Sequence, residues 1–347
     1  MKKLLVLIAY LGFIIHLNAQ TPLNELSENV YIEYLDKDSV FFKSPRIDFF
    51  QISSSISKDV KIAIAVYKPN KPSPILLKVH GWHGHVHRPE LHEKNPNTNF
   101  LTIDVDMRGR KYSTGKPDCN GYELYDFYDA YQFALEQYGH LISDPDQVYF
   151  EGGSGGGGNG YGLVGKFPDL FCSALITCGP CDYALWYRND EALEFQDEMV
   201  SWIGYPPDEN EESYASRSGI TTVSNLLTPI YICHGETDIQ VPSIHGRSYY
   251  EKAKSLNKKV RYLELKGVGD ERHWGNINDE QISRKQKFEK EALKKHAPPV
   301  LPEQGNFIVA GYLVTKQFSV FMKSINDVGI IHYHIPSQKI CFIKGSG

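Results

Sequence analysis

Apolar residues gather in short runs that alternate with longer amphipathic segments from about residue 75 onward. Residues 122–138 repeat apolar positions at helical spacing, and residues 280–295 have the pattern of a charged helix. Strands that alternate with helices predict an α/β fold, a doubly wound and mostly parallel sheet. The runs that have the length of strands buried on both faces are 75–79, 100–105, 148–150, 174–177, 230–233 and 260–265.

The segments on either side of this region have a different pattern. Residues 46–53 and 60–67 alternate apolar and polar positions, which predicts an N-terminal antiparallel hairpin. The proline-rich stretch within residues 297–347 breaks helix and is typical of a linker, and the short strand patterns after it predict a small C-terminal β unit. We therefore expect a catalytic domain over 20–296. Its aromatic and acidic insert, residues 182–227, is either a lid over a site or a surface excursion.

The N-terminus has the pattern of a secretory signal peptide. Two lysines precede an apolar run that ends at Leu17, and Ala19 is a small residue at its exit. The run is too short to span a membrane comfortably. The sequence therefore predicts a signal peptide over 1–19, a periplasmic or extracellular location, and no stable membrane span after processing. An N-terminal anchor that stays uncleaved is the alternative.

Charge and cysteine content narrow the class of protein further. The 37 basic and 42 acidic side chains give a net charge of -5, so no basic footprint supports nucleic acid as a partner. Six cysteines in 347 residues form no dense disulfide framework. Cys178-Gly-Pro-Cys181 has the spacing of a thiol redox motif, but a lone motif in mid-chain favours a structural role over a thiol oxidoreductase.

The strongest chemical signal is Gly152-Gly-Ser154-Gly-Gly156, which matches G-x-S-x-G. It follows a strand pattern and precedes a segment long enough for a helix, so Ser154 is expected on a tight turn with its hydroxyl exposed. There the amide of Gly155 can face a developing oxyanion. A flexible glycine linker is the alternative interpretation, but a linker does not normally lie between a buried strand and an amphipathic segment.

A serine nucleophile needs a base and an acid, which in this arrangement follow it in the order acid and then histidine. Asp238 follows the strand pattern 230–233, and His273 follows the pattern 260–265. We therefore predict that Asp238 orients His273 and that His273 transfers the proton.

Several neighbouring residues remain alternatives to these assignments. Glu236 and Asp270 are rival acids, and His234 is a rival base that lies too early, beside the strand end.

The loop after residues 75–79 predicts the second oxyanion donor, the backbone amide of Trp82. The same loop contains four histidines that offer a metal-binding alternative: His80, His83, His85 and His87. No second cluster of histidines and carboxylates completes such a site, which disfavours the metal-binding alternative.

Together these motifs resemble the α/β-hydrolase superfamily. Within it they are similar to the catalytic domain of the prolyl oligopeptidase family and its acetyl xylan esterase and dienelactone hydrolase relatives. The matching pieces lie between about residues 75 and 275: His80-Gly-Trp82, Asp106-Met-Arg-Gly-Arg-Lys-Tyr-Ser113, Gly152–Gly156, Phe167-Pro-Asp-Leu-Phe171, His234-Gly-Glu-Thr-Asp238 with Val241-Pro242, and His273. The elbow departs from relatives in having only glycines around Ser154, which predicts an open floor beside the serine.

The resemblance implies a Ser-His-Asp hydrolase without metal or organic cofactor. The main hypothesis is an exported serine hydrolase that cleaves a small ester or a short-peptide amide through an acyl-enzyme. A carbohydrate acetyl esterase, acting on an acylated carbohydrate, is the alternative. A hypothesis from another class is a non-catalytic module on a hydrolase fold that binds a glycan or a protein partner.

Overall fold

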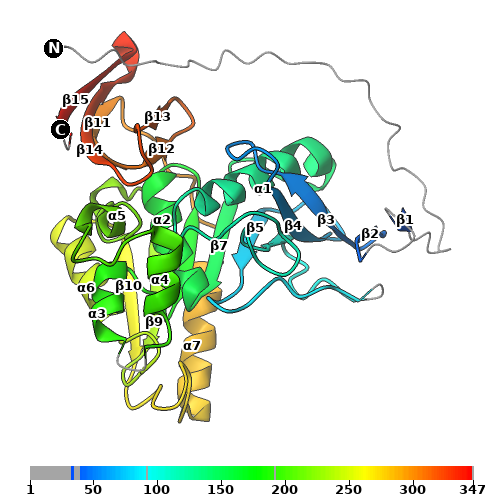
Figure 1. Ribbon diagram of the computed structural model, residues 1–347. Coiled ribbons are helices and arrows are strands. Elements are labelled where there is room, and N and C mark those ends of the chain that lie inside the picture. The colour runs from blue at the N-terminus through cyan, green and yellow to red at the C-terminus, as the bar shows by residue number, and fades with distance from the viewer. Residues whose placement is uncertain (1–32, 35–39, 91–92, 191–192, 346–347) are drawn as a thin grey trace.

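A ten-stranded sheet forms the centre of the molecule, in the order β1-β2-β3-β4-β6-β5-β7-β8-β9-β10 (Figure 1). The computed structural model describes residues 33–34, 40–90, 93–190 and 193–345. The predicted signal peptide therefore lies outside the described residues.

The four N-terminal strands are antiparallel to their neighbours, and β4 joins them to β6. From β6 to β10 the strands are parallel, which confirms the predicted fold class. The strands are β1 (Glu33–Tyr34), β2 (Phe42–Lys43), β3 (Ile47–Ser53), β4 (Lys61–Tyr67), β5 (Ile75–Val79), β6 (Leu101–Val105), β7 (Val148–Gly153), β8 (Ser173–Thr177), β9 (Ile230–Gly235) and β10 (Val260–Leu265).

Helices cover both faces of this sheet. On one face, α1 (Glu123–Tyr138), α2 (Gly155–Lys166) and α6 (Ile244–Ser255) contribute to the largest hydrophobic cluster. On the other face, α7 (Asp279–Ala292) packs Phe288 against strands β8 to β10. Because both faces are buried, the central strands can be apolar throughout, as the sequence pattern required.

The insert at 182–227 contains α3 (Tyr183–Asn189), α4 (Gln196–Ile203) and α5 (Glu211–Ala215). Most of its aromatic side chains are core residues. Trp186 is 1% exposed, and it packs with Tyr183 against Trp82 from the loop after β5. The insert is therefore fixed to the loop that the sequence assigns to the oxyanion site.

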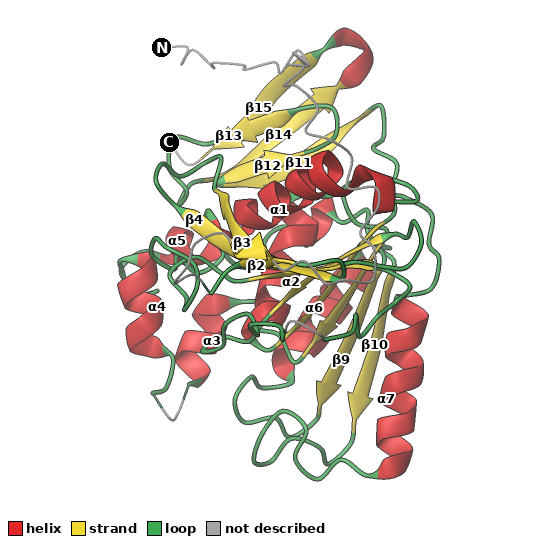
Figure 2. Cartoon of the chain, turned by 90° about the vertical axis from the view of Figure 1, so that its right-hand side faces the viewer, coloured by secondary structure: helices red, strands yellow, loops and turns green. Residues whose placement is uncertain are grey.

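The C-terminal region forms a separate antiparallel sheet in the order β13-β12-β11-β14-β15. Figure 2 shows it at the end of the molecule opposite the arrowheads of β9 and β10. Gly311, with a φ of 73°, separates the strands at 304–310 and 312–314. The strands are β11 (Gln304–Ala310), β12 (Tyr312–Val314), β13 (Ser319–Phe321), β14 (Val328–His334) and β15 (Lys339–Gly345). The described residues also contain the short 3-10 helices η1 (Gly139–Leu141), η2 (Val223–Asn225) and η3 (Ile335–Ser337).

None of the helices within the described residues is long and apolar enough to span a membrane.

Candidate active site

Ser154 lies on a sharp turn between β7 and α2. Its φ of 55° and ψ of -127° are unusual for a residue with a side chain, and such a conformation persists only when its surroundings hold it. The Ser154 amide donates to the carbonyl of Thr177 at 2.9 Å, and its own carbonyl accepts from the amides of Gly157 and Gly158. The predicted strand-turn-helix is therefore present, and Ser154 stands at the N-terminus of α2.

The glycines around Ser154 do not leave an open floor, so that expectation is wrong. A Cβ at Gly155 would lie 2.5 Å from the amide nitrogen of Trp82, and one at Gly156 would lie 2.7 Å from the carbonyl oxygen of His80. A Cβ at Gly157 would lie 2.8 Å from the Cα of Gly179. The missing side chains allow α2 to pack directly against the loops after β5 and β8, and those loops fill the space.

His273 and Asp238 form a tight pair at the ends of β10 and β9. The His273 Nδ1 and Asp238 Oδ2 atoms are 2.7 Å apart. The other carboxylate oxygen of Asp238 accepts from the amides of Gln240 and Val241, each at 3.0 Å. The Asp238 carboxylate is fully buried, whereas 18% of the His273 side chain is exposed. Asp238 therefore binds the imidazole at Nδ1, while part of the His273 side chain stays accessible to solvent.

The rival acids have other partners. Glu236 accepts from the amide of Gly267 at 2.8 Å, and Asp270 accepts from the side chain of Asn276. Among the described residues neither carboxylate contacts His273, so Asp238 is the acid that the fold brings to the imidazole.

His234 supports Asp238 from the other side, a role that the sequence reasoning missed. This histidine is fully buried, its Nε2 hydrogen-bonds the carbonyl of Val241 at 2.8 Å, and the same nitrogen lies 3.5 Å from Asp238 Oδ2. Burial alone would raise the pKa of Asp238, but the hydrogen bonds from His234 and His273 outweigh it and hold that pKa well below its usual range. Asp238 is therefore ionised wherever the protein is folded near neutral pH.

Ser154 and the His273–Asp238 pair lie at the same edge of the sheet. The Ser154 amide hydrogen-bonds the carbonyl of Thr177. The residue after Thr177 is Cys178, and its sulfur lies within 4.8 Å of side-chain atoms of both Asp238 and His273. Within the described part of the chain, no hydrogen bond joins the Ser154 hydroxyl to His273. Contacts between nucleophile and base are often long in enzymes without substrate and shorten when substrate binds.

The loop after β5 brings the Trp82 amide to the start of α2. A Cβ at Gly81 would lie 3.6 Å from the Cβ of Ser154, and Gly155 is in direct contact with the Trp82 backbone. The first turn of α2 also leaves the Gly155 amide without a partner inside the helix. Gly155 and the Trp82 backbone are therefore both adjacent to Ser154, and their role as oxyanion donors stays a prediction.

Glu198 on α4 holds this loop in place. Its carboxylate accepts from the Trp82 indole at 2.5 Å and contacts His83 Nε2 at 2.9 Å. The insert at 182–227 is thus hydrogen-bonded to the loop after β5, which carries the candidate oxyanion donor. A single acidic residue in an acidic insert gave no signal from which this contact could be predicted.

The side chains that could bind a metal ion have other roles in the structure. His80 accepts from the amide of Met107 at 3.1 Å, and none of the four loop histidines belongs to a group of three metal donors in the described residues. Cys178, Asp238 and His273 do form such a group. Asp238 hydrogen-bonds His273 and also contacts the Cys178 thiol, which accounts for the proximity of the three groups.

The Cys178-Gly-Pro-Cys181 motif lacks the environment of a redox site. Both cysteines are unpaired and buried, and burial raises the pKa of each thiol well above its usual value. Redox-active thiols need a lowered pKa, which makes the structural role the better interpretation.

The fold and the turn at Ser154 define an α/β hydrolase. The family model for the prolyl oligopeptidase family matches residues 97–297, more than half of the chain. The chain belongs to this family, which confirms the resemblance seen in the sequence and the class of serine-type hydrolase.

Two curated relatives and one solved structure illustrate the similarity. The uncharacterized peptidase YtmA of Bacillus subtilis is 28% identical over 46% of this chain and 61% of its own length. The acylamino-acid-releasing enzyme of Rattus norvegicus is 30% identical over 38% of this chain and 19% of its own length. Pyrococcus horikoshii acylaminoacyl peptidase superimposes with a TM-score of 0.60 at 18% identity, over 74% of this chain and 42% of that one.

The chain thus spans less than two thirds of the length of the curated relatives it matches. The individual roles of Ser154, Asp238, His273, Gly155 and Trp82 remain predictions from sequence and geometry.

Proposed function

We propose that this chain hydrolyses esters or short-peptide amides through an acyl-enzyme formed on Ser154. The observation that carries the proposal is the placement of a strained serine and a histidine paired with a buried aspartate at one edge of the sheet, next to two backbone amides. A serine hydroxyl is a weak nucleophile, so a neighbouring base and an oxyanion site give this placement its chemical meaning.

In the proposed reaction, the Ser154 oxygen attacks the substrate carbonyl while His273 Nε2 takes the hydroxyl proton. Asp238 keeps the Nδ1 proton of His273 in place and stabilises the imidazolium that forms. The amides of Gly155 and Trp82 donate to the oxyanion. His273 then returns its proton to the leaving alcohol or amine, and water releases the acyl group by the same steps in reverse order.

Acylated amino acids and short acyl-peptides are the substrate class we favour. The support is the similarity to the acylamino-acid-releasing enzyme and to the acylaminoacyl peptidase. The carbohydrate acetyl esterase has weaker support, because most of the aromatic rings of the insert are buried in the core and Trp186 offers no surface on which a sugar can stack. Export to the periplasm or the medium, which the N-terminal pattern predicts, is part of the proposal.

Labelling with a fluorophosphonate probe tests the mechanism directly. Wild-type protein should form a covalent adduct at Ser154, and Ser154→Ala should form none while it keeps the same melting temperature. The same proteins would then be assayed with N-acetyl-alanine p-nitrophenyl ester, N-acetyl-alanine p-nitroanilide and acetylated xylan. Absence of labelling and turnover in the wild type would favour the non-catalytic binding module, and turnover of xylan alone would favour the carbohydrate esterase.

A further inference from the structure

Arg110 lies on the aromatic surface that continues from the candidate oxyanion loop. Its guanidinium carbon is 4.7 Å from the centre of the Trp202 ring, and Trp202 lies 4.6 Å from the ring of Trp82. Trp202 belongs to α4 of the insert and is partly exposed, as is Arg110. Two ring contacts therefore connect Arg110 to the residue whose amide adjoins Ser154.

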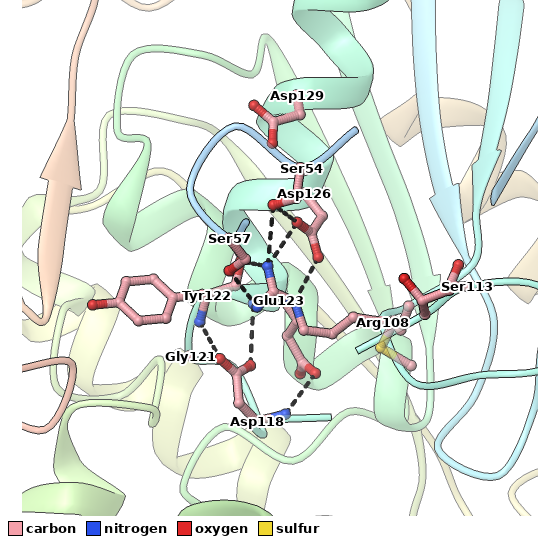
Figure 3. Close-up of polar contacts among 12 residues, drawn as sticks. Ser54, Ser57, Arg108, Ser113, Asp118, Gly121, Tyr122, Glu123, Asp126 and Asp129 are labelled. Atoms are coloured by element: carbon pink, nitrogen blue, oxygen red, sulfur yellow. Dashed lines mark hydrogen bonds and ion pairs between the residues drawn. The ribbon is translucent and has the colours of Figure 1, made fainter. Parts of the chain in front are cut away.

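Arg110 forms no ion pair among the described residues, although its positive charge acts on the buried carboxyl group of Glu123. The Arg110 Nε is buried without a hydrogen-bond partner. Arg108, two residues earlier, is the opposite case. It donates to Asp126 through two nitrogens at 2.7 Å each and also reaches Ser57, as Figure 3 shows.

The carboxylates near Arg110 already have other partners. Glu198 accepts from the Trp82 indole and from His83 Nε2. Glu123 accepts from the amide of Asn120 at 2.6 Å. A buried nitrogen without an acceptor costs free energy, and a ligand oxygen can reach this guanidinium only through its less buried terminal nitrogens.

We propose that Arg110, held against Trp202, recognises a carboxylate on the acyl side of the substrate. The substrate class is an amino-acid or peptide derivative whose N-acyl group ends in a carboxylate, such as a succinyl group. The planar guanidinium offers a fork of donors that matches a carboxylate, and the Trp202 face orients that fork. This inference rests on the proposed function, because it specifies a substrate of the same site.

Matched esters test the proposal. The p-nitrophenyl esters of N-succinyl-alanine and N-acetyl-alanine differ in one carboxylate. Arg110→Gln should raise KM for the succinyl ester about tenfold or more, the scale of a lost charge-assisted hydrogen bond, and should leave the acetyl ester within about twofold. Arg110→Lys should recover part of the preference. Lys111→Gln is the control, because it removes a neighbouring exposed charge that lies over Tyr112 instead.

A binding measurement separates this inference from the proposed function. In Ser154→Ala, N-succinyl-alanine should change the tryptophan fluorescence at lower concentration than N-acetyl-alanine, and a further Arg110→Gln substitution should remove the difference. The inference is overturned if Arg110→Gln affects both esters equally, if Lys111→Gln has the same effect, or if the two ligands bind alike. A wild type that neither turns over substrate nor labels, yet prefers the succinyl ligand, would refute the function and keep the Arg110 site.

Discussion

Replacing Gly155 by alanine tests whether the contact between α2 and the Trp82 loop forms the oxyanion site. The new Cβ would lie 2.5 Å from the Trp82 nitrogen and 2.6 Å from its Cα. Ordinary contacts between such atoms are about 3.5 Å, so the loop must retreat by about 1 Å.

The size of this displacement determines how far kcat should fall. A hydrogen bond to the oxyanion at about 2.9 Å would lengthen to about 3.9 Å and be lost. Loss of one oxyanion donor costs roughly 100- to 1,000-fold in kcat, or about 3–4 kcal/mol of transition-state stabilisation. The ground-state carbonyl depends less on this donor, so KM should change little.

The assay is steady-state hydrolysis of N-acetyl-alanine p-nitrophenyl ester by the wild type and Gly155→Ala, with Ser154→Ala as the background. Gly139→Ala is the matched control, because Gly139 has a helical φ of -51° and no atom within 4 Å of its Cβ position. Melting temperatures show whether a variant is folded. A folded Gly155→Ala protein with kcat within threefold of the wild type would refute the assigned oxyanion geometry.

Three further substitutions have expected outcomes. Asp238→Asn should lower kcat by about 10,000-fold. Because the folded pKa of Asp238 is depressed, its contribution to stability is present above the unfolded pKa of about 4 and fades as pH falls below it, so melting curves of wild type and variant should converge in acid. Glu198→Gln, which weakens the hold on Trp82, should lower kcat by up to about tenfold, and a larger rise in KM than fall in kcat would contradict this role. Burial, aided by the charge of Arg217, lowers the pKa of Lys166 to about 7, so wild type should gain stability relative to Lys166→Met between about pH 7 and pH 10, and a constant difference in melting temperature would argue against a shifted lysine.

The local pattern of residues was enough to predict the strands of the central sheet and the turn at Ser154. The run at Ile75–Val79 is a strand with the expected bounds, and its first three residues are apolar and buried, as a strand covered on both faces requires. The turn at Ser154 was equally predictable, since glycines next to a serine between a strand and a helix satisfy a local backbone requirement. Such features depend on residues that are close in sequence, so the sequence alone determines them.

The tertiary structure decided which groups meet. Glu236, Asp238 and Asp270 all lie on loops at the correct sheet edge, and only the loop conformations bring Asp238 to His273. The hydrogen bond from Trp82 to Glu198 joins residues that are 116 positions apart in the sequence. Loop conformation and packing between distant segments depend on the whole fold, which composition and periodicity do not encode. For the same reason the glycines beside Ser154 were expected to leave space, whereas the folded chain fills that space with two neighbouring loops.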